Sequence, residues 1–268
     1  MDAERALYAF GLTALAGLCT GIGGAVAFFT RRTDARLLSG ALGFSAGVMI
    51  FISLTELLVE SSRSLEASLG PSAGGWAVLG GFFGGILLTA LIDRAVPEVE
   101  NPHEARRIES ADPSGHAPTR LLRMGLLTAG ALTLHNFPEG LAVFVSALQD
   151  PAVGLSIAAA VAIHNIPEGA SISVPIYYAT GSRKKAFLYS TLTGLAEPLG
   201  ALVGWFFLSR FLGGPLSGLT LAVTAGIMVF ISFDELLPGA HEYGEHHVAV
   251  YGLMSGMAVM AVLLRLFA

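Results

Sequence analysis

Residues 122–148, LRMGLLTAGALTLHNFPEGLAVFVSAL, and residues 152–179, AVGLSIAAAVAIHNIPEGASISVPIYYA, decide the fold of this chain. Each segment is long enough to cross the hydrocarbon layer of a bilayer as a helix, which takes about 20 residues. Each also carries the hexapeptide His-Asn-x-Pro-Glu-Gly near its middle, at 135–140 in the first and 164–169 in the second. The two segments therefore predict two membrane helices with polar residues at mid-depth.

The composition of the whole chain fits a lipid environment. Hydrophobic residues make up 53% of it and charged residues 13%, whereas a soluble domain carries roughly 25% charged residues. Cys19 is the one cysteine, which excludes an internal disulfide and a cysteine-based zinc cluster and predicts a small buried residue. No run of Lys and Arg with interleaved aromatics occurs, so no nucleic-acid partner is predicted.

We predict an all-α integral membrane protein with eight transmembrane helices. The apolar segments are too long and continuous for the strands of an outer-membrane barrel, which take about 10 residues each. The first segment lacks the cationic start of a secretory signal and is predicted to be retained. Residues 94–121, with His103 and His116, are predicted to form a mobile cytoplasmic loop. The eight spans lie at about 6–29, 36–59, 74–93, 122–148, 152–179, 186–209, 215–238 and 247–267.

The basic residues gather on one side of this topology. Because cytoplasmic loops carry the excess of Lys and Arg, that side is predicted to be cytoplasmic, with both termini outside the cell inner (plasma) membrane. The cytoplasmic set is Arg31, Arg32, Arg36, Arg94, Arg106, Arg107, Arg120, Arg123, Arg183, Lys184 and Lys185, and the other side holds Arg5, Arg63, Arg210 and Arg265.

Two internal repeats run in opposite directions through the predicted membrane. Residues 46–58, AGVMIFISLTELL, return as residues 225–237, AGIMVFISFDELL, and the hexapeptide of the fourth span returns in the fifth. Inverted repeats around a midplane site are a recurring design of secondary transporters. We therefore predict a single transmembrane domain over residues 1–268, with its spans arranged 3+2+3.

The repeated hexapeptides carry the residues of a metal site. His135 and Glu139 are four positions apart, and Asn136 and Glu139 three apart, so all three side chains project from one face of a helix. Pro138 disturbs the helix one turn back and can free a carbonyl toward the same face. The second hexapeptide repeats this pattern with His164, Asn165, Pro167 and Glu168.

Three carboxylates near mid-depth lack a basic partner in the predicted spans. They belong to Glu139, Glu168 and Glu197, the last of which precedes Pro198. An unpaired charge at the bilayer centre costs on the order of 2.5–3.5 kcal/mol on insertion scales. A divalent metal bound by carboxylate, imidazole and amide groups would compensate these charges. The donors suffice for two adjacent ions bridged by Glu139 and Glu168.

Other residues are weaker candidates for contact with the metal. Met49 is either a space-filling residue, like its repeat partner Met228, or a soft ligand. Glu56 lies near the outer end of the second span, and Asp234 and Glu235 lie near the inner end of the seventh. These carboxylates either mark the two mouths of a transport path or are solvated groups at helix ends. Loop residues that either collect metal or are simply solvated are His103, His116, His241, Glu242, Glu245, His246 and His247. The glycine pairs predicted as packing faces are Gly43/Gly47, Gly80/Gly84, Gly81/Gly85 and Gly252/Gly256.

Through these motifs, with residues 194–197 (GLAE) and 231–236 (ISFDEL), the chain resembles the ZIP (Zrt/Irt-like) metal transporters, and among them the bacterial ZupT type. The resemblance implies eight spans with both termini outside, import into the cytoplasm, a binuclear site, often a homodimer, and alternating access with an elevator-like movement. Some relatives have Gln and Asp where this chain has His164 and Asn165. The ligands implied are His135, Asn136, Glu139, His164, Asn165, Glu168 and Glu197, with Met49 bordering the site and Asp234 and Glu235 near the exit.

The expected activity is uptake of Zn²⁺, with Fe²⁺, Mn²⁺, Co²⁺ or Cd²⁺ as co-substrates, because a nitrogen and oxygen site without thiolate discriminates weakly among these ions. Two alternatives stay open at this point. An intramembrane metal-dependent hydrolase would also bury His and Glu, but the order here is His-x-x-x-Glu and not His-Glu-x-x-His. A metal exporter would share the ligands and reverse the flux.

Overall fold

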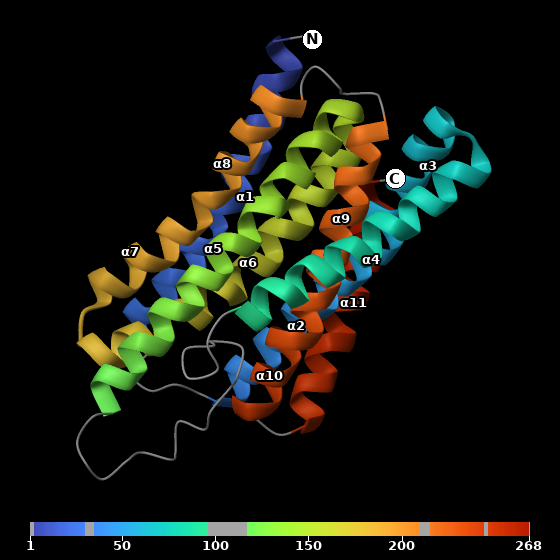
Figure 1. The fold of residues 1–268 in the computed structure, drawn as a ribbon. Coiled ribbons are helices and arrows are strands. Elements are labelled where there is room, and N and C mark those ends of the chain that lie inside the picture. Colours follow the sequence, from blue (N-terminus) through green and yellow to red (C-terminus); the bar gives the residue numbers. More distant parts are fainter. Residues whose placement is uncertain (1–2, 30–34, 96–116, 209–214, 244–245, 268) are drawn as a thin grey trace.

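The computed structural model describes residues 3–29, 35–95, 117–208, 215–243 and 246–267. Every element in these ranges is a helix (Figure 1), so the predicted all-α class is confirmed. Residues 96–116, with His103 and His116, lie outside the described residues, as does Glu245.

The described helices form eight spans, as predicted. Three of these spans contain a short π-helix, labelled η. The spans are α1 (Ala3–Phe29); α2 (Ala35–Ile52) with η1 (Ser53–Leu57) and α3 (Leu58–Leu69); α4 (Pro71–Ala95); α5 (Ala117–Gln149); α6 (Pro151–Thr180); α7 (Arg183–Gly194) with α8 (Ala196–Val203) and η2 (Gly204–Leu208); α9 (Pro215–Ile231) with η3 (Ser232–Leu236) and α10 (Leu237–Tyr243); and α11 (His246–Phe267).

Seven of these spans are long and apolar enough to cross a membrane by length and composition. The span α5 is not among the seven, and its apolar stretch is interrupted by His135, Asn136 and Glu139. The second span is longer than predicted, because α3 continues it to Leu69. The eight spans alternate in direction, so α1 begins and α11 ends toward the same side of the bundle (Figure 1).

A tight connection joins α5 to α6. The carboxylate of Asp150 accepts hydrogen bonds from the backbone N–H groups of Ala152 and Val153, which caps α6, and Pro151 occupies the first helical position. Gly181, at φ 64°, ends α6 in the left-handed region that favours glycine. Because one residue separates the two helices, α5 and α6 form an antiparallel hairpin whose two hexapeptides can face each other.

The spans pack as two groups. The first group consists of α1, α5, α6, α7 and α8, and the second of α2, α3, α4, α9, α10 and α11. The groups meet chiefly where α2 packs on α6. Figure 1 shows the first group beside the second, with α6 toward the boundary between them.

Symmetry-related contacts support the inverted 3+2+3 arrangement. Helix α1 packs on α6, and its repeat partner, α7 with α8, packs on α5. In the same way, α2 packs on α11, and its repeat partner α9 packs on α4. Gly169 of α6 lies against the carbonyl oxygen of Thr20, and Gly140 of α5 lies against the carbonyl oxygen of Glu197. A Cβ at either glycine would collide with that backbone. The helices can therefore approach this closely only at glycine.

The segments 46–58 and 225–237 also match in local structure. Each contains a π-helix, η1 or η3, and in each a serine hydroxyl donates to the carbonyl of the methionine four residues back. The Ser53 Oγ to Met49 O distance is 2.7 Å and the Ser232 Oγ to Met228 O distance is 2.8 Å. Single-turn π-helices inside α-helices are frequent at functional sites.

The glycine packing faces were predicted correctly for three of the four pairs. Backbone of a neighbouring helix lies against Gly43, Gly47, Gly85, Gly252 and Gly256, and side chains lie against Gly81. The prediction was wrong for Gly80 and Gly84: no atom of the described chain lies within 4 Å of a Cβ built at either position. These two glycines lie on the outward face of α4, which is the least buried of the candidate spans.

Candidate metal centre

The two hexapeptides bring their polar side chains together inside the bundle. His135, Asn136 and Glu139 come from α5, and His164, Asn165 and Glu168 come from α6. Pro138 lies inside α5 without ending it. All six polar residues, together with Glu197 of α8, are at most 2% exposed. So many buried polar groups at one level require a compensating partner.

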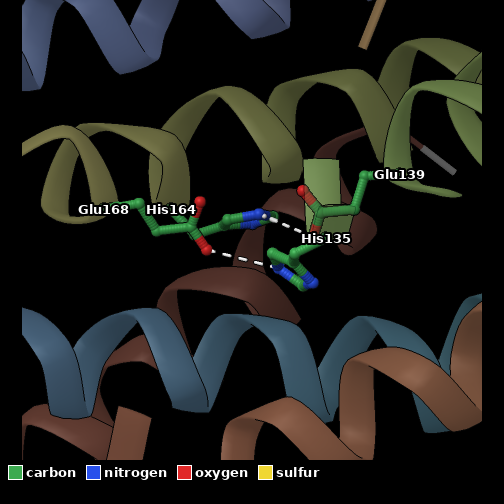
Figure 2. Close-up of side chains that lie close together, drawn as sticks. All are labelled: His135, Glu139, His164 and Glu168. Atoms are coloured by element: carbon green, nitrogen blue, oxygen red, sulfur yellow. Dashed lines mark hydrogen bonds and ion pairs between the residues drawn. The ribbon is translucent and has the colours of Figure 1, made fainter. Parts of the chain in front are cut away.

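Four of these residues form a compact cluster of potential ligands. His135 Nε2 lies 3.1 Å from Glu139 Oε1 and 3.4 Å from Glu168 Oε1, and His164 Nε2 lies 3.0 Å from Glu139 Oε1. One ligand atom from each of the four lies within 4.8 Å of all the others. Figure 2 shows the two imidazoles and two carboxylates converging on one point.

Each residue of this cluster has a side-chain atom that is not otherwise used. Glu139 Oε2, Glu168 Oε2 and the Nδ1 atoms of His135 and His164 have no hydrogen-bond partner. Among the described residues, no Lys or Arg pairs with these carboxylates. A buried set of imidazole and carboxylate groups with free lone pairs suits a borderline divalent cation such as Zn²⁺.

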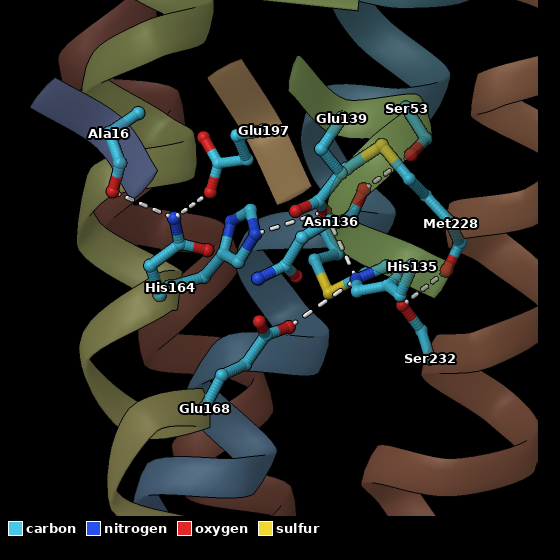
Figure 3. Close-up of polar contacts among 12 residues, drawn as sticks. Ala16, Ser53, His135, Asn136, Glu139, His164, Glu168, Glu197, Met228 and Ser232 are labelled. Carbon is cyan, nitrogen blue, oxygen red and sulfur yellow. Dashed lines mark hydrogen bonds and ion pairs between the residues drawn. The ribbon is translucent and has the colours of Figure 1, made fainter. Parts of the chain in front are cut away.

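Glu197 joins the centre through an asparagine. Asn165 Nδ2 donates to Glu197 Oε1 at 2.5 Å and to the carbonyl oxygen of Ala16 at 2.9 Å. Glu197 lies at the start of α8, next to the break in the helix at Leu195. It is therefore placed beside the four-residue cluster without belonging to it, as Figure 3 shows.

Asn136 makes the corresponding contact on the other half of the repeat. Its Nδ2 donates to the carbonyl oxygen of Thr193 on α7 at 3.3 Å. Each asparagine of the two hexapeptides thus holds its helix to a neighbouring one, Asn165 to α1 and Asn136 to α7. Their side-chain oxygens have no hydrogen-bond partner and remain available to a cation.

The weaker candidates do not belong to the four-residue cluster. Met49 is fully buried in the main apolar core, which also contains Met228. Glu56 is half-buried on η1, and Asp234 and Glu235 are half-buried on η3. The structure does not bring these three carboxylates into the four-residue cluster.

Histidines also gather near α10, away from the centre. His241 Nδ1 lies 2.7 Å from the carbonyl oxygen of Leu237, and His241 Nε2 lies 2.9 Å from His246 Nδ1. His246 packs edge-on against His247. These rings are exposed.

Sequence reasoning did not find the contacts that α1 and α7 make with the two asparagines. The groups involved are the carbonyl oxygens of Ala16 and Thr193, which no side-chain motif marks. A signal was present in the glycines, because Gly17 and Gly23 have the same spacing as Gly194 and Gly200. This spacing marks α1 and α7–α8 as a third pair of the inverted repeat.

Comparison with known proteins places this arrangement in a family. A family model described as ZIP zinc transporter matches residues 93–264. The zinc transporter ZupT of Streptococcus mutans serotype c is 57% identical over 259 residues, covering 97% of both chains. That of Nitratidesulfovibrio vulgaris is 55% identical over 100% of this chain and 99% of the relative. That of Chlorobium phaeovibrioides is 58% identical over 96% of this chain and 97% of the relative.

Proposed function

The chain belongs to the ZIP zinc transporter family, and we propose on this basis that Zn²⁺ crosses the bundle through the cluster of His135, Glu139, His164 and Glu168. As a member of that family, the protein takes up divalent metal ions and is not an enzyme. The single observation that carries the proposed route is the convergence of the four buried side chains, without a basic partner among the described residues.

The donors of this cluster suit an ion that must bind and then leave. Neutral imidazole and carboxylate bind Zn²⁺ directly, while the cation removes the cost of burying the two carboxylates. Glu139 and Glu168 project from opposite halves of the hairpin, and each has an oxygen left for a second ion. We propose a binuclear centre in which Asn136, Asn165 and Glu197 complete the second position.

The same proposal extends to selectivity and to the path. Without thiolate ligands the centre also accepts Fe²⁺, Mn²⁺, Co²⁺ and Cd²⁺, and the Met49 thioether borders it as a soft contact. Glu56 lies at the outer mouth of the path, and Asp234 and Glu235 at the inner mouth.

We further propose the cellular setting. The chain works as one domain over residues 1–268 in the cell inner membrane, in contact with lipid. Its two termini lie outside the cytoplasm, as the distribution of Lys and Arg predicts, and it assembles as a homodimer. The hydrolase and exporter alternatives are not favoured, because the family supports metal uptake.

Zinc uptake into proteoliposomes tests the proposed route. We expect His135→Ala and Glu168→Ala each to abolish uptake while the purified proteins keep the elution profile of the wild type. Glu66→Ala, an exposed carboxylate on α3, is the matched control and should transport normally. Uptake by either cluster variant at the wild-type rate would contradict the route.

A competition assay tests selectivity and coupling in the same vesicles. Fe²⁺, Mn²⁺, Co²⁺ and Cd²⁺ are each expected to reduce uptake of labelled zinc. Running the assay with and without a pH gradient measures whether protons move with the metal. Failure of all four ions to compete would contradict the proposed weak discrimination.

A further inference from the structure

The inverted repeat gives Glu197 a counterpart on α1, and that counterpart is Thr20. Four pairs of residues on α1 and on α7–α8 keep the same spacing, Ala16 with Thr193, Gly17 with Gly194, Thr20 with Glu197 and Gly23 with Gly200. The structure supports this alignment independently of the sequence. Gly17 and Gly194 each lie against the carbonyl oxygen of the other where the two helices cross.

Contacts on either side of that crossing are also paired. Gly140 lies against the carbonyl oxygen of Glu197, and Gly169 against that of Thr20. Asn136 Nδ2 donates to the Thr193 carbonyl at 3.3 Å, and Asn165 Nδ2 to the Ala16 carbonyl at 2.9 Å. Thr20 therefore occupies on α1 the place that Glu197 occupies on α8, one helical turn from a carbonyl bound by an asparagine of the centre.

The hydroxyl of Thr20 lacks its usual partner. A threonine inside a helix commonly donates to the carbonyl four residues back, as Thr13 does to Ala9 at 2.9 Å. For Thr20 that carbonyl belongs to Ala16, which already accepts from Asn165. Thr20 is fully buried, and its Oγ1 has no hydrogen-bond partner.

A buried hydroxyl without a partner costs stability, and binding a ligand would satisfy the Thr20 hydroxyl. We propose that the Thr20 hydroxyl is an oxygen donor of the metal centre, the uncharged counterpart of Glu197. This inference rests on the proposed function of the centre.

The substitution gives the two halves of the centre different charge. The α5 half has Glu139 with Glu197 at its side, and the α6 half has Glu168 with Thr20 at its side. Since a carboxylate holds a divalent ion more strongly than a hydroxyl does, the ion on the Thr20 side is the weaker bound of the two.

Zinc titration of the purified protein tests this inference. Thr20→Val removes the hydroxyl and keeps the shape of the side chain, and we expect it to weaken the lower-affinity zinc binding by about tenfold, the effect of one lost polar contact. Thr20→Ser keeps the hydroxyl and should bind zinc within about twofold of the wild type. Thr13→Val removes a buried hydroxyl of the same helix that is already paired with a backbone carbonyl and should leave zinc affinity unchanged.

Thermal unfolding of the metal-free variants separates a ligand from a structural hydroxyl. The unfolding temperature of Thr20→Val should equal or exceed that of the wild type, because an unsatisfied group has been removed. A lower unfolding temperature with wild-type zinc affinity would overturn the inference and assign Thr20 a packing role. Wild-type affinity and stability together would overturn it as well. Absence of zinc binding by the wild type would instead refute the proposed function, and this inference with it.

Discussion

At the scale of single residues, Glu197 is the carboxylate on which the proposed second ion depends. Its carboxylate lies outside the four-residue cluster and accepts a hydrogen bond from Asn165. In the proposed binuclear centre, Glu197 supplies the negative charge of the second position. Loss of the Glu197 charge should therefore change the number of zinc ions bound and leave the four-residue cluster able to bind zinc.

We expect Glu197→Gln to lower the zinc content of the purified protein from two ions to one per chain. The amide keeps the size of the side chain but removes the charge that the second ion neutralises. Metal analysis after equilibrium dialysis measures the result. Glu60→Gln changes a half-buried glutamate of α3 that pairs with Arg63 and should leave two ions bound. Two ions retained by Glu197→Gln would argue against its role.

Acid pH should weaken zinc binding, because protons compete for the same lone pairs. Metal ligands must be deprotonated, so His135, His164 and the neighbouring carboxylates take up protons as the metal leaves. We expect the apparent affinity to fall as pH is lowered from about 7.5 to about 5.5, by up to tenfold per pH unit for each competing proton. Calorimetric titration across this range measures it. Affinity that stays constant or rises toward acid pH would be inconsistent with imidazole ligation.

At the scale of elements, glycine contacts set the position of the helices that carry the proposed ligands. Gly140 lies against the backbone of Glu197, and Gly169 against that of Thr20. Both glycines directly follow a glutamate of the cluster in sequence. Within each hexapeptide, the glycine that packs against the neighbouring helix therefore also fixes the position of the glutamate before it.

We expect Gly140→Ala to destabilise the protein by about 1–3 kcal/mol, the typical cost of overpacking, and to reduce zinc uptake because α8 must shift. Gly80→Ala is the matched control, since its Cβ would meet no described atom and alanine favours helix over glycine. Unfolding in detergent and uptake in vesicles measure the two effects. Equal stability and equal zinc uptake of the two variants would mean that α5 and α8 can move apart without loss of function.

At the scale of the whole molecule, the proposed ligands belong to one group of helices. His135, Glu139, His164, Glu168 and Glu197 all lie on α5, α6 and α8 of the first group. The apolar core that contains Met49 and Met228 of the second group also includes residues of α5 and α6, so it packs between the two groups. Inverted repeats favour transport by movement of one such body against the other.

A cross-link between the two groups should therefore stop uptake. Gln149 of α5 donates to Ser217 of α9 at 2.7 Å, which joins the first group to the second. We expect Gln149→Cys with Ser217→Cys, in a Cys19→Ser background, to lose zinc uptake after treatment with a short reducible bis-thiol reagent and to regain it after reduction. The control pair is Ser39→Cys with Ala240→Cys, within the second group. If its cross-link also stops uptake, or if the first pair transports when linked, relative movement of the groups is not required.

Local chemistry made much of this molecule predictable from sequence. A helix that spans a membrane must satisfy its own backbone, so long apolar segments predict the eight spans. His, Asn and Glu at spacings of three and four residues project from one face of a helix whatever surrounds it. The short link at Asp150 then brings the two hexapeptides into one hairpin.

Other features depended on which helices meet. The repeat shared by α1 and α7–α8 has glycines and leucines in common but no shared polar residue, and its alignment became clear only where Gly17 and Gly194 cross. The glycine pairs illustrate the same limit, because identical spacing packs at Gly81 and Gly85 and faces outward at Gly80 and Gly84.

The sequence by itself determined the helical class and the number of spans, and it predicted the residues of the candidate metal site, because these follow from periodicity and from the cost of charge in lipid. Only the tertiary structure decided that Glu197 lies beside the cluster and bonds to Asn165, that the proposed ligands share one group of helices, and that the Thr20 hydroxyl is left without a partner. Such features depend on contacts between helices far apart in the chain, which local spacing does not encode.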